Sequence, residues 1–132
     1  MKIDNIKMIS KNITSIDNLA SEFKELFGSE EAKKDSGIVY FFLSKNPIPR
    51  VRGESNILYI GKTNQSLNKR YFRYSDKLAS NRSGDFYKYI IEEFGGISIG
   101  YLSTDKPKAL EAEYFKEYCD LHLEYPPKSK VG

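Results

Sequence analysis

The runs Gly37-Ile-Val-Tyr-Phe-Phe-Leu43 and Asn56-Ile-Leu-Tyr-Ile-Gly61 decide the fold of this 132-residue chain. Both are rich in β-branched and aromatic residues, a composition that is typical of buried strands. Residues 44–55 between them contain two prolines and a glycine, so we expect a loop there. Two strands joined in this way predict an antiparallel hairpin.

Apolar residues at helical spacing surround the predicted hairpin. Residues 16–27 predict an amphipathic helix that begins after Ser15 and ends at Gly28, and residues 29–36 predict a linker. The remaining expected elements are helices over 66–80 and 85–94, a loop over 81–84, a strand over 97–102 and a last helix over 107–122.

This order of elements predicts an α+β domain, with a small three-stranded antiparallel sheet flanked by helices and an extra N-terminal helix. We expect residues 1–36 to form an N-terminal helical extension and linker, and residues 37–132 to form the main domain. A chain of 132 residues suits a single globular unit with one core.

The composition argues against several classes of protein. The longest apolar run is far shorter than the ~20 residues of a membrane-spanning helix. The first residues lack the apolar core of a signal peptide, so we expect a cytoplasmic protein with no membrane partner. The single cysteine, Cys119, excludes an internal disulfide, and the single histidine, His122, argues against a Cys/His zinc site. We interpret both as core residues of the last helix.

Charge is unevenly distributed, although the net charge of the chain is only +3. The net charge is −1 over residues 1–36, +7 over residues 37–90 and −3 over residues 91–132. A central block this basic suggests contact with a polyanion, most often nucleic acid. The alternative is a solvated surface, because Lys and Arg are exposed in most proteins whatever their function.

In the last predicted helix, Glu111 interrupts the pattern of its own face. At about 100° per residue, Glu111 lies near the middle of the apolar face, whereas Glu113 and Asp120 fall on the opposite side. A carboxylate in an apolar stripe is costly unless it is paired or binds a metal. Glu111 is therefore a candidate metal ligand, and the alternative is a salt bridge at the helix edge.

Four features occur in a characteristic order: Gly37-Ile-Val-Tyr40, Tyr59-Ile60-Gly61, Arg70 in the following helix and Glu111 in the last helix. Together they resemble the GIY-YIG nuclease family, with Val-Tyr in place of Ile-Tyr in the first motif. The resemblance covers about residues 37–127. The chain departs from the family after the last helix, where Pro126-Pro-Lys-Ser-Lys130 stands in place of an asparagine.

The resemblance implies a divalent-metal-dependent endonuclease that hydrolyses phosphodiester bonds, with DNA as the favoured nucleic acid. Such hydrolysis needs an activated water, a clamp on the phosphate and stabilisation of the leaving oxygen. Tyr59 would be the general base and Arg70 the phosphate clamp. Glu111 would hold one Mg²⁺ or Mn²⁺, an ion that needs only one or two carboxylates.

Other residues complete the candidate site. Tyr40 would orient Tyr59 or relay its proton, Tyr74 would bind phosphate, and Lys62 would be a nearby cation. The alternative for each tyrosine is packing, because rings on strands and helices usually belong to the core. The residues expected to contact backbone phosphates are Arg50, Arg52, Arg73, Lys77 and Arg82.

Two other functions are compatible with the same residues. The first is a DNA- or RNA-binding module of the same fold without catalysis. The second is a protein-interaction domain in which the N-terminal amphipathic helix recruits a partner. The oligomeric state and the biological role do not follow from these motifs.

Overall fold

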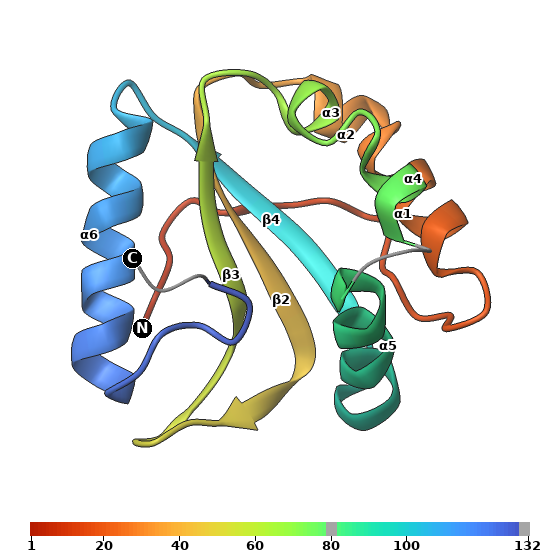
Figure 1. The fold of residues 1–132 in the computed structure, drawn as a ribbon. Helices are drawn as coiled ribbons and strands as arrows, with labels where there is room; N and C mark the ends of the chain where they lie inside the picture. Colours follow the sequence, from red (N-terminus) through yellow and green to blue (C-terminus); the bar gives the residue numbers. More distant parts are fainter. Residues whose placement is uncertain (79–81, 130–132) are drawn as a thin grey trace.

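A computed structural model describes residues 1–78 and 82–129 of the chain, apart from the Arg82 side chain. One antiparallel sheet with strand order β1-β4-β2-β3 has helices on both faces (Figure 1). The strands are β1 (Lys7–Met8), β2 (Ile38–Pro49), β3 (Glu54–Thr63) and β4 (Ile97–Ser103). The helices are α1 (Leu19–Phe27), α2 (Glu30–Lys33), α3 (Leu67–Arg70), α4 (Tyr74–Leu78), α5 (Arg82–Phe94) and α6 (Pro107–His122).

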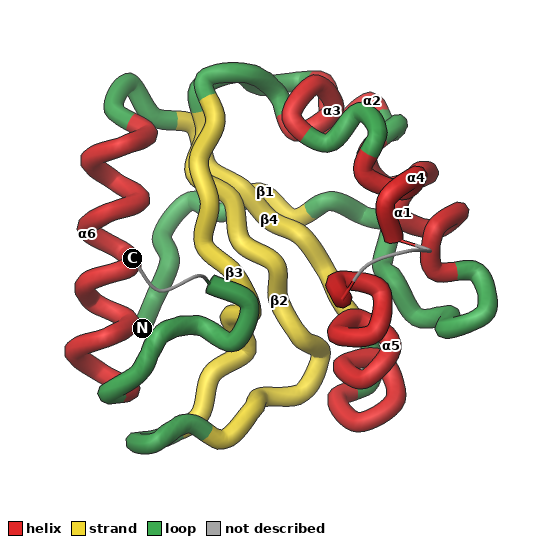
Figure 2. The backbone as a smooth tube through the Cα atoms, viewed as in Figure 1, coloured by secondary structure: helices red, strands yellow, loops and turns green. Residues whose placement is uncertain are grey.

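The predicted α+β class is confirmed, and the described sheet has one strand more than expected. The additional strand, β1, contributes two residues that pair with Gly100 and Tyr101 of β4. Figure 2 shows β1 beside β4, on the side of the sheet away from β3. A two-residue strand has no periodicity, so no sequence pattern indicates it.

The predicted 44–55 loop is wrong, because both strands of the hairpin continue into it. Strand β2 runs to Pro49, which pairs with Glu54 of β3. Strand β4 pairs with β2 only as far as Ser44. In the described part of the chain, no strand pairs with this edge of β2 beyond Ser44, and proline is tolerated on such an edge because no ladder hydrogen bond is lost there.

The helix predicted over 66–80 is interrupted. The chain leaves the helical conformation at Tyr71, between α3 and α4, where the ring stacks on Phe27 of α1 with centroids 4.6 Å apart. Residues 79 and 80 of the predicted helix and residue 81 of the predicted loop lie outside the described residues. Helix α5 begins at Arg82 rather than 85, whereas the last helix spans Pro107–His122 as predicted.

The predicted linker contains the short helix α2, which is capped by Ser29: its hydroxyl accepts a hydrogen bond from the Ala32 amide. Helix α1 begins at Leu19, three residues later than predicted. Ser15 still makes a cap-like contact, because its hydroxyl accepts a hydrogen bond from the Asn18 amide in the turn before α1.

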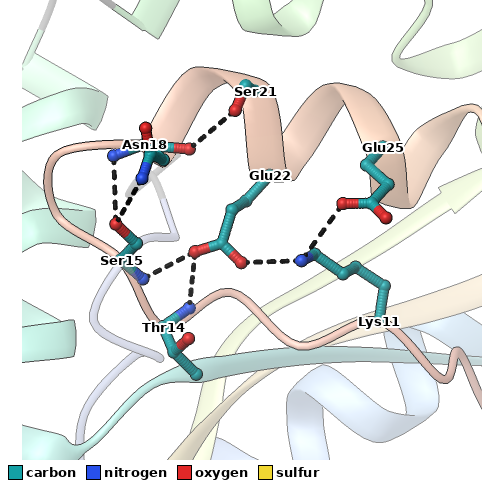
Figure 3. Close-up of polar contacts among 7 residues, drawn as sticks. All are labelled: Lys11, Thr14, Ser15, Asn18, Ser21, Glu22 and Glu25. Carbon is teal, nitrogen blue, oxygen red and sulfur yellow. Dashed lines mark hydrogen bonds and ion pairs between the residues drawn. The ribbon is translucent and has the colours of Figure 1, made fainter.

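The N-terminal segment is part of the main core. Phe23 and Leu26 of α1 are fully buried against the face of the sheet that α5 also covers. Glu22 fixes the preceding chain, because its carboxylate accepts hydrogen bonds from the amides of Thr14 and Ser15 and lies 2.9 Å from the Lys11 ammonium (Figure 3). A second, smaller core lies between the sheet and α6.

Within residues 1–78 and 82–129, the search for a helix long and apolar enough to cross a membrane found none.

Candidate active site

A cleft of about 530 Å³ lies at the edge of the sheet formed by β3. It brings together Tyr59 of β3, Arg70 of α3 and Glu111 of α6, which are far apart in the sequence. Of the other candidates, Tyr74 and Lys77 also line it. The remaining lining residues are Phe42, Ile60, Tyr71, Ser83, Tyr87, Phe115, Lys128 and Ser129.

A β-bulge directs Tyr59 towards the cleft. Phe42 pairs with Tyr59 while Leu43 pairs with Ile57, so Leu58 is an extra residue on β3. In a regular strand Leu58 and Tyr59 would point to opposite faces, yet both pack against the main core. The bulge therefore places Tyr59 on the same face of the sheet as Tyr71 and Tyr74, which also pack in the main core.

Gly61 leaves room for the ring of Tyr40. The two residues pair across β2 and β3, and a Cβ atom at position 61 would lie 2.4 Å from Tyr40 Cζ. Real Cβ atoms do not approach other atoms so closely, so any larger residue would displace the ring. The glycine of the Tyr-Ile-Gly motif, which lies inside β3, thus has a packing role.

Tyr40 lies beneath the cleft and is only 1% exposed. Its hydroxyl accepts a hydrogen bond of 2.8 Å from the Tyr71 hydroxyl, and its ring centroid is 6.1 Å from that of Tyr59. Burial raises the pKa of Tyr40 to about 12 and raises the pKa of Tyr71 further. Both phenols therefore keep their protons near neutral pH, and Tyr40 is placed to position its neighbours.

Arg70 lies at the end of α3, a helix that Ser66 caps by accepting a hydrogen bond from the Lys69 amide. Its guanidinium carbon is 5.0 Å from the centroid of the Tyr71 ring, a cation–π contact that orients the planar donor group. Tyr74, on α4, hydrogen-bonds through its hydroxyl to that of Tyr87 at 2.7 Å. Burial raises the pKa of Tyr74, so this phenol is also protonated near neutral pH.

Glu111 is half-buried on α6, as its place in the apolar stripe predicts, whereas Glu113 is exposed. Burial raises the pKa of Glu111, and the positive charge of Lys62 acts in the opposite direction. Among the described residues, no hydrogen bond or ion pair satisfies this carboxylate. A half-buried carboxylate without such a partner is suited to a cation supplied from outside.

The described part of the chain contains no group of three or more His, Cys, Asp or Glu side chains that could enclose a metal. Glu111 offers a single carboxylate, which is enough for an ion that keeps most of its waters and shares phosphate oxygens. Mg²⁺ and Mn²⁺ prefer such oxygen ligands, and Mg²⁺ is commonly held by one or two carboxylates.

Arg50 and Arg52 were expected to contact phosphates, but the structure places both away from the cleft. Arg50 is paired with Glu124 at 2.7 Å. The Arg52 guanidinium donates to the carbonyls of Asp120 and Leu121, at the end of α6. These two side chains attach the hairpin turn to the end of α6, where a cation complements the helix dipole.

Within the described residues, the remaining side chains that the sequence singles out do not line the cleft. Lys62 is exposed on β3 and Arg73 is exposed in the turn between α3 and α4; neither lines the cleft. The Arg82 side chain lies outside the described residues. The core interpretation of His122 is confirmed, because it is 4% exposed and its Nδ1 lies 2.8 Å from the Arg52 carbonyl oxygen. Cys119 is half-buried.

Sequence reasoning missed several cleft residues, among them Tyr71, Tyr87, Ser83 and Lys128. The two tyrosines belong to apolar sequence patterns that are equally typical of core packing. Lys128 follows two prolines in the segment after the last helix, where no helical or strand pattern indicates a role. Its place in the cleft depends on the hydrogen bond between its amide and the carbonyl of Leu58, a contact between distant residues that no local sequence pattern indicates.

Comparison of the chain with models of protein families, with curated proteins and with solved structures gave no match. The chemistry of the cleft is nevertheless well defined. Among the residues that the structure describes, Arg70, Lys77 and Lys128 line the cleft as cations and Glu111 lines it as a carboxylate. A concave site with this excess of positive charge attracts anions.

Proposed function

We propose that this chain is a divalent-metal-dependent endonuclease that hydrolyses phosphodiester bonds in DNA. The observation that carries the proposal is the convergence of Tyr59, Arg70 and Glu111 in one cleft, from three separate elements. These side chains supply a proton acceptor, a phosphate clamp and a metal ligand. The positive lining of the cleft favours a polyanionic substrate over a neutral one.

Arg70 would grip the scissile phosphate, because a guanidinium can donate two parallel hydrogen bonds to phosphate oxygens. Its stacking on Tyr71 restricts its orientation before the substrate arrives. Ordering of this kind lowers the entropy that must be lost when the phosphate binds.

Tyr59 would accept the proton of the attacking water, with the guanidinium of Arg70 in the same cleft to hold the phosphate. The Tyr40 ring packs beside that of Tyr59, and Tyr40 is itself held by the hydrogen bond from Tyr71. Both residues would therefore position Tyr59. Glu111 would hold one Mg²⁺ or Mn²⁺, which supplies charge stabilisation at the phosphate and the leaving oxygen when bound.

The proposal is tested by titrating Mg²⁺ and Mn²⁺ against supercoiled plasmid DNA, with labelled single-stranded DNA and RNA as parallel substrates. We expect metal-dependent nicking by the wild type and a loss of at least about 100-fold in Glu111→Gln. The matched control is Glu113→Gln, which removes an exposed carboxylate two residues away on the same helix and should nick like the wild type.

Three outcomes would contradict the proposal. Equal nicking by Glu111→Gln and the wild type would show that cleavage does not need Glu111 as a metal ligand. Binding of DNA or RNA without cleavage in either metal would favour the binding module. The absence of nucleic-acid binding at low salt would favour the protein-interaction domain.

A further inference from the structure

The segment that follows α6 folds back onto the outer edge of β3. Leu123, in the left-handed conformation, ends the helix, and the chain then returns across the front of the sheet (Figure 1). The Lys128 amide donates a hydrogen bond of 2.9 Å to the carbonyl of Leu58, the residue before Tyr59. This contact attaches Lys128 directly beside the proposed base.

The Lys128 ammonium has defined surroundings inside the cleft. Nζ donates a hydrogen bond of 2.9 Å to the Ser83 hydroxyl of α5. It also lies 5.5 Å from the ring centroid of Tyr87 and 5.9 Å from that of Phe86. The hydrogen bond and the two ring contacts orient the ammonium within the cleft.

Arg70 and Lys128 lie at opposite ends of a row of tyrosine rings. Arg70 contacts Tyr71, whose centroid is 5.0 Å from that of Tyr74, and the Tyr74 centroid is 6.3 Å from that of Tyr87, which Lys128 contacts. The cleft therefore carries one ordered cation on the α3 side and another on the α5 side. One cation is enough to bind a single phosphate, so a second ordered cation can bind a second phosphate.

We propose that Lys128 is a second phosphate-binding residue of the cleft, which contacts a phosphate neighbouring the one that Arg70 holds on the same strand. This inference rests on the proposed function and extends it, because it assigns a two-phosphate footprint to the site. In it, Lys128 positions the strand, whereas Arg70 acts on the reacting phosphate.

The test is the salt dependence of DNA binding, measured by fluorescence anisotropy of a labelled duplex in EDTA, which prevents metal-dependent cleavage. The proteins compared are the wild type, Lys128→Gln, Lys128→Arg and the control Lys88→Gln, which removes an exposed lysine on α5 that does not line the cleft. Thermal denaturation of each variant reports whether the fold is kept.

Each phosphate contact contributes about 0.9 to the slope of log K against log salt concentration. We expect the slope of Lys128→Gln to be shallower by about one, with binding about threefold to tenfold weaker. Lys128→Arg should keep the wild-type slope, because the positive charge is retained, and Lys88→Gln should also keep it.

A Lys128→Gln slope equal to that of the wild type would overturn the inference, as would an equal change in Lys88→Gln. If Lys128→Gln loses thermal stability, the comparison moves to Lys128→Arg and Lys128→Met, and an equal slope for these two would overturn it. Failure of the proposed function gives a different result. If the wild type binds DNA with a steep salt dependence but never cleaves it, the phosphate-binding role of Lys128 stands and the proposed catalysis is wrong.

Discussion

The ring of Tyr40 lies directly over the α-carbon of Gly61, so closely that a Cβ atom at position 61 would be 2.4 Å from Tyr40 Cζ. The same Tyr40 hydroxyl accepts the hydrogen bond of Tyr71 beneath the cleft. The cross-strand pair of Tyr40 and Gly61 therefore connects the Tyr-Ile-Gly motif of β3 to the hydrogen-bonded tyrosines Tyr40 and Tyr71.

We expect Gly61→Ala to destabilise the fold by about 1–3 kcal/mol, because a methyl group must displace a fully packed ring. Urea unfolding measures the change. The double variant Gly61→Ala/Tyr40→Ala should be less destabilised than the sum of the two single variants, since removal of the ring relieves the clash. Additive losses would show that the contact does not limit substitution at position 61.

Glu22 should stabilise the fold in a pH-dependent way. Burial by itself would raise the pKa of Glu22, but the Lys11 ammonium and the amides of Ser15 and Thr14 lower it overall. A lowered folded-state pKa means that the stabilisation is complete above the ordinary pKa of 4.5 and is lost as the pH falls through the folded-state value.

We therefore expect Glu22→Gln to lose about 1–3 kcal/mol at pH 7, with a smaller difference from wild type as the pH is lowered below about 4.5. Denaturant unfolding across this pH range measures both effects. Glu25→Gln is the matched control: Glu25 also pairs with Lys11 but its side chain is 68% exposed, so its loss should cost less than about 1 kcal/mol. Equal losses in the two variants at every pH would contradict the account.

Glu111 should show the opposite dependence, because burial raises its folded-state pKa. The ionised carboxylate lowers the stability of the fold above that pKa, and this cost disappears as the pH falls and the folded state binds the proton. At pH 7 without metal, Glu111→Gln should melt at or slightly above the wild-type temperature, by about 1–3 °C.

Added Mg²⁺ or Mn²⁺ should raise the melting temperature of the wild type but not that of Glu111→Gln, since a ligand that binds only the folded state stabilises it. Glu113→Gln should respond to metal like the wild type. A clear loss of stability in metal-free Glu111→Gln would indicate a structural role for this carboxylate.

Arg52 and Arg73 carry the same charge but should behave differently. Arg52→Gln removes hydrogen bonds to the end of α6, so it should lower the free energy of unfolding by about 1 kcal/mol and leave DNA affinity unchanged. Arg73→Gln, on the exposed turn beside Arg70, should weaken DNA binding without changing the melting temperature. The reverse pattern would show that the hairpin turn belongs to the DNA interface.

The sequence predicted those elements whose signal is local. The hairpin strands and α6 have strong apolar patterns, and Glu111 was singled out because it interrupts one of them. The features that escaped prediction depend on contacts between distant residues: β1 pairs with β4, and Lys128 is attached to Leu58. The bulge at Leu58 was also hidden, because a continuous apolar run reads the same with or without it.

The most direct test of the cleft as a nuclease site is one plasmid-nicking experiment in Mg²⁺ and Mn²⁺ with the wild type, Tyr59→Phe, Arg70→Gln and Glu111→Gln. We predict that the wild type nicks the plasmid only with metal and that each variant is at least about 100-fold slower while its melting temperature stays within a few degrees of the wild type. Wild-type nicking rates in all three folded variants would contradict the account.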